Sequence, residues 1–309
     1  MKKILAIAVA TAISAPAMAD MTIGATYAFG YTNVEYDVPA AAADDSGSGF
    51  GTDTAAINVS ASTEVNGYTV TGKISAGGLT RGSAVTGENA ELTVSGDFGK
   101  VQAGEYELGS GIRALGTAGA PVNNMEGEIL GAAANKAMVK YTAPAMGPVT
   151  LSVNMAQTLG MGTGDDTAST GVAAAISMGA VSAKVDYTSW QDNVTTADDR
   201  IRAAVKVDLG SFAIGAGVDN TDAPNGGTTE YTVAGVNYIV SDATSVGVAY
   251  AKKETKASSG AATTSVDGYT VGFTTALSSN VSLNGNFSEW ETSATADANK
   301  TNLIVSYSF

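Results

Sequence analysis

Apolar residues recur at every second position along most of the chain, and this alternation constrains the fold more than any other feature. A period of two places apolar side chains on one face of a β-strand and polar side chains on the other face. Sixteen such runs follow one another, separated by clusters of Gly, Asn, Asp, Ser and Thr, which are typical of turns. The sequence therefore predicts an all-β protein.

The connections between these runs alternate between short and long. The short ones include a tight hairpin signal at Asn66-Gly67, and the longest connection covers residues 107–136. Short turns at one end and long loops at the other are typical of a transmembrane β-barrel, whereas a soluble sandwich gives no reason for such regularity. We therefore expect residues 20–309 to form a single domain, a 16-stranded antiparallel transmembrane β-barrel.

Charged residues avoid the apolar positions of the expected strands, as a lipid-facing surface requires. Lys or Arg on the lipid side of a barrel costs about 2–4 kcal/mol at the bilayer midplane, and the strand lysines and arginines lie on the opposite parity. Glu105 is an exception, because it shares the parity of Val101 and Ala103. We expect either a β-bulge at Gly104 or a strand that has already left the membrane at this point.

Aromatic residues gather near both ends of the expected strands, which predicts the two aromatic girdles of a membrane barrel. Tyr141 and Tyr238 fit these girdles less well than the other residues do. Trp190 and Trp290 lie at the loop ends of their strands and receive no role from the sequence.

The first 19 residues are typical of a secretory signal peptide. Lys2 and Lys3 are followed by an apolar run and by Ala17-Met18-Ala19, so we expect cleavage between Ala19 and Asp20. The apolar run is too short to span a bilayer, and no later stretch is long and apolar enough to form a transmembrane helix.

The last residues form an amphipathic strand that ends in an aromatic residue. Leu303, Val305, Tyr307 and Phe309 share one parity. A strand at the chain terminus has no further partner unless the sheet closes on itself. Tyr307 and Phe309 resemble the assembly signal of bacterial outer-membrane barrels.

The chain contains no cysteine and no histidine. This excludes disulfides and every Ser-His or Cys-His nucleophile pair, and we expect no catalytic residue, no cofactor and no metal site. Without Lys2 and Lys3, the 16 basic residues become 14, against 30 acidic ones, which gives a net charge of −16. Such a charge argues against nucleic acid as a partner and favours cations at any opening.

The segment Gly96-Asp97-Phe98-Gly99-Lys100-Val101-Gln102-Ala103-Gly104 is similar to a turn of the Gram-negative general porin family. The resemblance covers nearly the whole chain and implies a homotrimer of barrels in the outer membrane of a Gram-negative bacterium. It also implies that the long third loop, about 107–136, is folded into the lumen and narrows an hourglass pore. Sixteen strands leave an aqueous channel, so we expect passive diffusion of small hydrophilic solutes and ions, with a preference for cations.

The constriction is predicted from two sets of charged and polar residues. Acidic loop residues facing basic wall residues would create a transverse field across the lumen. Alternatively, the loop glutamates are simply solvated. The family often has an arginine where this chain has Glu105, so the family's constriction geometry does not carry over directly. The loop set is Glu105, Glu107, Arg113, Asn123, Asn124, Glu126 and Glu128, and the wall set is Lys73, Lys140, Lys184, Arg200, Arg202 and Lys206.

Other functions remain open at the level of the sequence. One is a substrate-selective channel of the same architecture, which a line of aromatic residues in the lumen would favour. Another is a structural or adhesive outer-membrane barrel with a closed lumen. In each case the expected partners are outer-membrane lipid, lipopolysaccharide, the barrel-assembly machinery and further copies of the chain.

Overall fold

A computed structural model describes residues 20–37, 46–80, 85–107, 110–121, 135–158, 167–190, 198–223, 226–258, 263–293 and 296–309. The expected signal peptide, including Ala19, lies outside these residues, as do Asn123, Asn124, Glu126 and Glu128 of the loop set. The backbone of Glu107 lies within them as the last residue of its strand.

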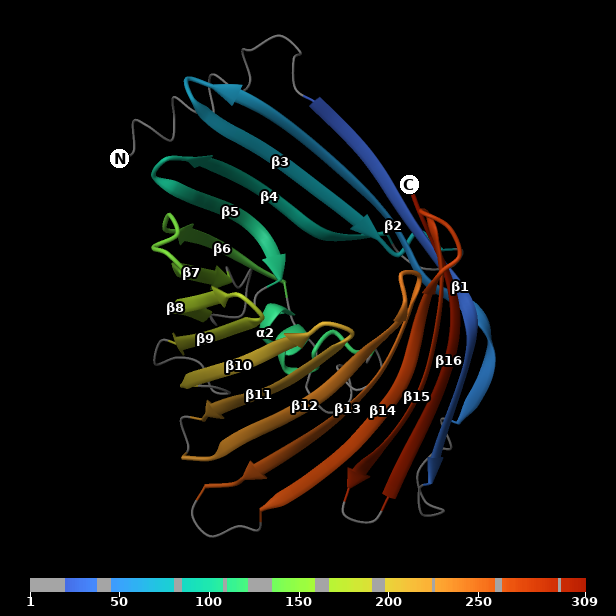
Figure 1. Cartoon of the computed structure of the whole chain (residues 1–309). Coiled ribbons are helices and arrows are strands. Elements are labelled where there is room, and N and C mark those ends of the chain that lie inside the picture. Colours follow the sequence, from blue (N-terminus) through green and yellow to red (C-terminus); the bar gives the residue numbers. More distant parts are fainter. Residues whose placement is uncertain are drawn as a thin grey trace.

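Sixteen antiparallel strands form one closed barrel, in which each strand pairs with its neighbours in the sequence (Figure 1). This confirms the predicted fold class. The first eight strands are β1 (Asp20–Asp37), β2 (Gly47–Val65), β3 (Tyr68–Gly77), β4 (Thr86–Gly96), β5 (Gly99–Glu107), β6 (Asn135–Thr142), β7 (Val149–Thr158) and β8 (Thr167–Met178). The second eight are β9 (Val181–Trp190), β10 (Asp199–Leu209), β11 (Phe212–Asp222), β12 (Thr228–Ser241), β13 (Thr244–Lys256), β14 (Thr264–Ala276), β15 (Val281–Ser293) and β16 (Ala296–Ser308).

The barrel closes between its first and last strands, β1 and β16. Their register runs from Thr26 opposite Ser308 to Asp37 opposite Asp297. At the end of this seam the Ala25 N–H donates to the Phe309 carbonyl over 3.0 Å, and the Phe309 N–H donates back over 3.1 Å. The terminal strand therefore has the partner that only a closed sheet can provide.

The two faces of the wall differ as the alternation predicts. Paired residues of adjacent strands project to the same face, so the register divides the side chains into an outward and an inward set. The outward set is apolar and exposed, with Val139 at 53% and Ile201 at 52%. The inward set is mainly polar or small and includes buried Asn286, Ser288 and Asn302.

The outward aromatic residues pair near the strand ends. Tyr238 packs against Phe212 with 4.5 Å between ring centroids, and the Tyr141 hydroxyl donates to the Phe98 carbonyl over 2.8 Å. Both tyrosines, which fitted less well in the sequence, therefore join the aromatic residues at the end of the barrel that carries the short turns. We call this the turn end, and the opposite end the loop end.

Several strands extend further toward the loop end than the apolar alternation indicated. Two examples are β2, which already begins at Gly47, and β13, which continues to Lys256. Backbone pairing continues here between polar residues, which show no apolar period. The sequence also gave no sign of the short helix α2 (Ser110–Gly116).

Glu105 lies in β5, and the predicted bulge at Gly104 is wrong. The β4–β5 register continues without a shift from Gly96 opposite Gly99 to Ala90 opposite Glu105. Gly104 serves instead to let the two strands approach, because a Cβ there would lie 2.0 Å from the Ala90 carbonyl oxygen, at a φ of +144°. Glu105 shares the outward face with Ala90 and Ala137 and does not belong to the long connection. That the strand has left the membrane there stays a prediction.

Candidate functional site

The predicted wall residues share the inward face of the barrel. Lys184 and Asp186 of β9 alternate with outward Val185, and the register places Arg202 opposite Asp186 and Ala204 opposite Lys184. The same relation holds for the rest of the wall set. On their strands, Lys73, Lys140, Arg200 and Lys206 occupy the inward parity.

Three basic residues of β10 are paired with inward carboxylates. Arg202 holds Asp186 with two hydrogen bonds, from Nε to Oδ1 over 2.8 Å and from Nη2 to Oδ2 over 3.0 Å. Arg200 binds Asp219 in the same two-pronged way, with Nε to Oδ1 at 2.7 Å. Lys206 lies 3.0 Å from Asp208. Two-pronged pairs fix the guanidinium plane as well as its position, so β9, β10 and β11 present an ordered charged wall.

Three inward lysines form a second group, which we call the lysine cluster: Lys100 of β5, Lys140 of β6 and Lys184 of β9. Lys140 lies within electrostatic range of Lys100, Lys184 and Asp186. Within the described strands, none of the three makes an ion pair.

Helix α2 and the turn after it lie against the inward face of neighbouring strands. The helix contacts β9, β10, β11 and β12, and Figure 1 shows it inside the ring of strands. Ile112 and Ala118 are buried at 3% and 2% exposure. The described part of the long connection therefore lies along the inward face of the wall. That the whole connection narrows the pore stays a prediction, because residues 122–134 lie outside the described chain.

Glycines on four adjacent strands make this approach feasible, and we call them the glycine track: Gly215, Gly235, Gly247 and Gly272. A Cβ on Gly215 would lie 2.0 Å from the Leu115 carbonyl oxygen, and one on Gly235 would lie 2.4 Å from that of Thr117. Gly247 and Gly272 face Ala120 and Pro121 in the same way. The backbone of residues 115–121 thus occupies the space that side chains would otherwise fill.

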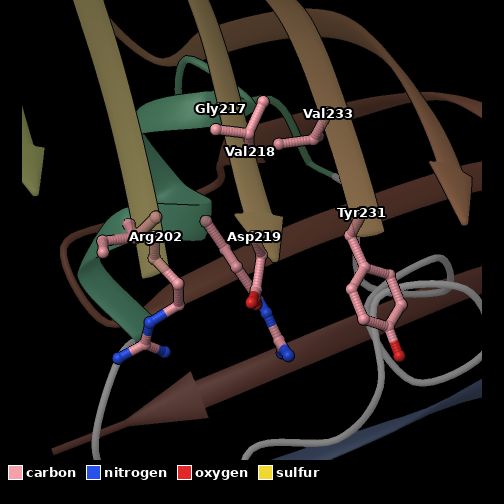
Figure 2. Close-up of a pocket in the computed structure, with 8 residues that line it drawn as sticks. Arg202, Gly217, Val218, Asp219, Tyr231 and Val233 are labelled. Carbon is pink, nitrogen blue, oxygen red and sulfur yellow. The ribbon is translucent and has the colours of Figure 1, made fainter. Parts of the chain in front are cut away.

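A small hollow of about 20 Å³ remains between α2 and the strands β10, β11 and β12, room for roughly one water molecule. Figure 2 shows Arg202, Asp219 and Tyr231 projecting from three adjacent strands beside it. Arg113 is the loop-set residue that lines this hollow. The structure therefore brings Arg113 close to Arg202 of the wall set.

Several inward residues were missed in the sequence. Lys136 was assigned to the long connection, yet it lies in β6 with its ammonium 5.5 Å from the Trp190 ring centroid. Lys253 lies in the same way 5.6 Å from Tyr231. Parity could have found Trp190, because it shares the positions of Lys184 and Asp186. Lys100 was hidden because it follows directly on a turn.

The described parts of the chain contain no group of three or more acidic residues placed to hold a metal ion. Among the same residues, no helix has the length and apolarity needed to cross a bilayer.

Comparison with known proteins gives one family and one fold. The model of the family described as Gram-negative porin matches residues 6–307. The anion-selective porin from Comamonas acidovorans superposes with a TM-score of 0.73 at 16% identity, covering 94% of this chain and 100% of that one. The trimer form of OmpT from Vibrio cholerae superposes with a TM-score of 0.70 at 14% identity, covering 94% of this chain and 99% of that one. The outer membrane channel DcaP of Acinetobacter baumannii superposes with a TM-score of 0.72 at 14% identity, covering 96% of this chain and 99% of that one. No curated protein sequence matches the chain.

Proposed function

Because the chain belongs to the Gram-negative porin family and is an outer-membrane channel protein, we propose that it forms a water-filled pore for passive diffusion of small hydrophilic solutes and ions. The observation that carries this proposal is the division of the wall into an exposed apolar outer face and a charged inner face. A barrel of sixteen strands is too wide for side chains alone to fill.

The proposal includes a constriction formed by the connection 107–136. The contacts of residues 110–121 with the inner wall support it, since they bring this connection into the lumen side of β10–β14. Asn123, Asn124, Glu126 and Glu128 would then complete the narrow part, opposite the wall set, and Arg113 would neutralise part of their charge. Glu107 is not included, because it lies in β5 on the outward parity of Glu105. Replacing Glu126 and Glu128 by glutamine should change the single-channel conductance if they line the constriction.

The preference of the pore for cations or anions depends on the charges that face the lumen. The net charge of −16 supports the cation preference expected from the sequence. That charge is spread over the whole chain, however, and only the part of it that faces the lumen acts on an ion in transit. Reversal potentials in a salt gradient measure this preference directly.

A substrate-selective channel is the second candidate function, and one observation favours it. Trp190 and Tyr231 project inward, and each faces a lysine, Lys136 and Lys253 respectively. Aromatic rings in a lumen offer stacking surfaces to planar or sugar-like solutes. Rates of solute entry into liposomes distinguish the candidates. A diffusion pore passes solutes in order of size, whereas a selective channel passes one solute faster than its size predicts.

We also propose that the protein acts as a homotrimer in contact with outer-membrane lipid and lipopolysaccharide, after insertion by the barrel-assembly machinery. The trimer form of OmpT from Vibrio cholerae has the same fold. Crosslinking of the purified protein in detergent tests this assembly, and a monomer at all protein concentrations would contradict it.

The decisive experiment is planar-bilayer conductance of the refolded mature protein. Large ohmic steps, grouped in threes, would support a trimeric diffusion pore. Barrels that are demonstrably folded but do not conduct would overturn the proposal and favour a structural or adhesive barrel with a closed lumen.

A further inference from the structure

We propose that the lysine cluster, Lys100, Lys140 and Lys184, forms an anion-binding site in the lumen, so that the pore favours small inorganic and carboxylate anions over cations. This inference rests on the proposed channel function and opposes the cation preference expected from net charge. It follows from which charges face the lumen and which of them are already paired.

The three lysines of the cluster make no ion pair within the described strands, whereas Arg200, Arg202 and Lys206 of β10 each have a carboxylate partner. Arg202 and Arg200 are held in two-pronged pairs by Asp186 and Asp219. Asp186 is the carboxylate within electrostatic range of both Lys140 and Lys184, and it is already bound by Arg202. The cluster therefore keeps a positive charge that the described wall does not cancel.

The wall between these lysines is small and uncharged. Strands β7 and β8 separate Lys140 from Lys184, and their register places Ser152 and Asn154 opposite Ala173 and Gly171 on the inward face. The Asn154 amide lies over Gly171, where a Cβ would meet its oxygen at 2.5 Å. The Asn154 amide nitrogen has no hydrogen-bond partner among the described residues. The inward face of β7 and β8 thus places neutral polar groups, and no competing carboxylate, between the lysines.

The lumen-facing charges of the described strands also sum to a positive charge. The acidic ones are fewer than the basic ones, although the whole chain is acidic. The register gives the inward basic residues as Lys73, Lys100, Lys136, Lys140, Lys184, Arg200, Arg202, Lys206, Lys253 and Lys300, and the inward acidic ones as Asp20, Glu64, Glu91, Asp186, Asp208 and Asp219.

Charges on the outward parity have less influence on an ion inside the barrel. Asp199, Asp222 and Glu289 are examples on the outward parity. The Debye length is about 8 Å at physiological ionic strength, so charges behind the wall or beyond the rim are largely screened from the lumen. The ion preference should therefore follow the inward residues and not the net charge.

The test compares reversal potentials in a KCl gradient for the wild type and for the double variant Lys140→Gln/Lys184→Gln. A unit positive charge roughly 10 Å away in water raises the local anion concentration and lowers the local cation concentration by about twofold each, so removing two such charges should lower the chloride-to-potassium permeability ratio by up to about sixteenfold in dilute salt, and by less where salt screens them. The matched control is Lys252→Gln/Lys256→Gln. It removes two positive charges from the outward parity of β13, and its ratio should stay at the wild-type value.

A second measurement tests binding at the cluster. Added sulfate should reduce the chloride conductance of the wild type and of the control, and should lose most of this effect in the double variant. A conducting wild type that prefers potassium, or a double variant with an unchanged ratio, would overturn the anion site and leave the channel function intact. Absence of conductance from folded protein would instead overturn the channel function itself.

Discussion

The pair between Arg202 and Asp186 is the most enclosed ion pair of the described wall, with side chains only 10% and 9% exposed. Removing one partner of a buried pair leaves the other charge uncompensated, at a cost of about 3–5 kcal/mol. Asp186→Asn should therefore lower the temperature at which the folded barrel loses its compact mobility on an SDS gel.

Asp208→Asn is the matched control for this prediction. It also removes a lumen carboxylate bound to a β10 residue, but Asp208 is 48% exposed and its partner Lys206 is 28% exposed. Exposed pairs contribute about 0–1 kcal/mol, so this variant should unfold near the wild-type temperature. Equal shifts in the two variants would show that burial of the pair at Asp186 does not matter.

For single residues, the sequence predicted which face of the wall a side chain occupies but not which residue it pairs with. The wall set could be placed on the inward face because the side-chain period of a strand is two. The partner of Arg202 depends on the register between β9 and β10, and a shift of that register would offer different residues. Lys184 and Arg202 looked alike in the sequence, yet only Arg202 has a carboxylate opposite it.

Helix α2 and the turn after it are positioned by the glycine track rather than by side-chain pockets. Gly235→Ala would place a Cβ 2.4 Å from the Thr117 carbonyl oxygen, and overpacking of this kind costs about 1–3 kcal/mol. We expect residues 115–121 to move away from the wall, which should change the single-channel conductance and increase its fluctuations at high voltage.

Gly49→Ala provides the control, because a Cβ there meets no atom within 4 Å. Its conductance should match that of the wild type. If Gly235→Ala also conducts like the wild type, with equal noise, the segment is not held by close contact with the track.

The strands themselves were predictable, whereas the path of the long connection was not. Alternation identified every strand in its hydrocarbon-facing part, and the turn at Asn66-Gly67 has the positive φ values of 52° and 79° that this dipeptide predicts. The position of residues 115–121 depends on glycines that lie far away in the sequence, on β11 to β14. No local pattern links these glycines to α2.

For the whole molecule, the separation of an acidic exterior from a basic described lumen predicts a preference that depends on salt. The Debye length shrinks from about 10 Å at 0.1 M to about 3 Å at 1 M. Raising the mean KCl concentration at a fixed concentration ratio should therefore bring the permeability ratio toward the mobility ratio of the free ions. A ratio that does not change with salt would indicate selection by pore size and not by charge.

The seam between β1 and β16 also has a consequence in time. It joins residues as far apart in the chain as Thr26 and Ser308, whose hydroxyls lie 3.3 Å apart across 282 positions. Folding rates fall as contacting residues become more distant in sequence, so closure of the seam should be the slow step of the refolding reaction. Until it occurs, β1 and β16 each present an open edge on which another chain can add a strand. The waiting time before closure thus sets how long each molecule is exposed to aggregation.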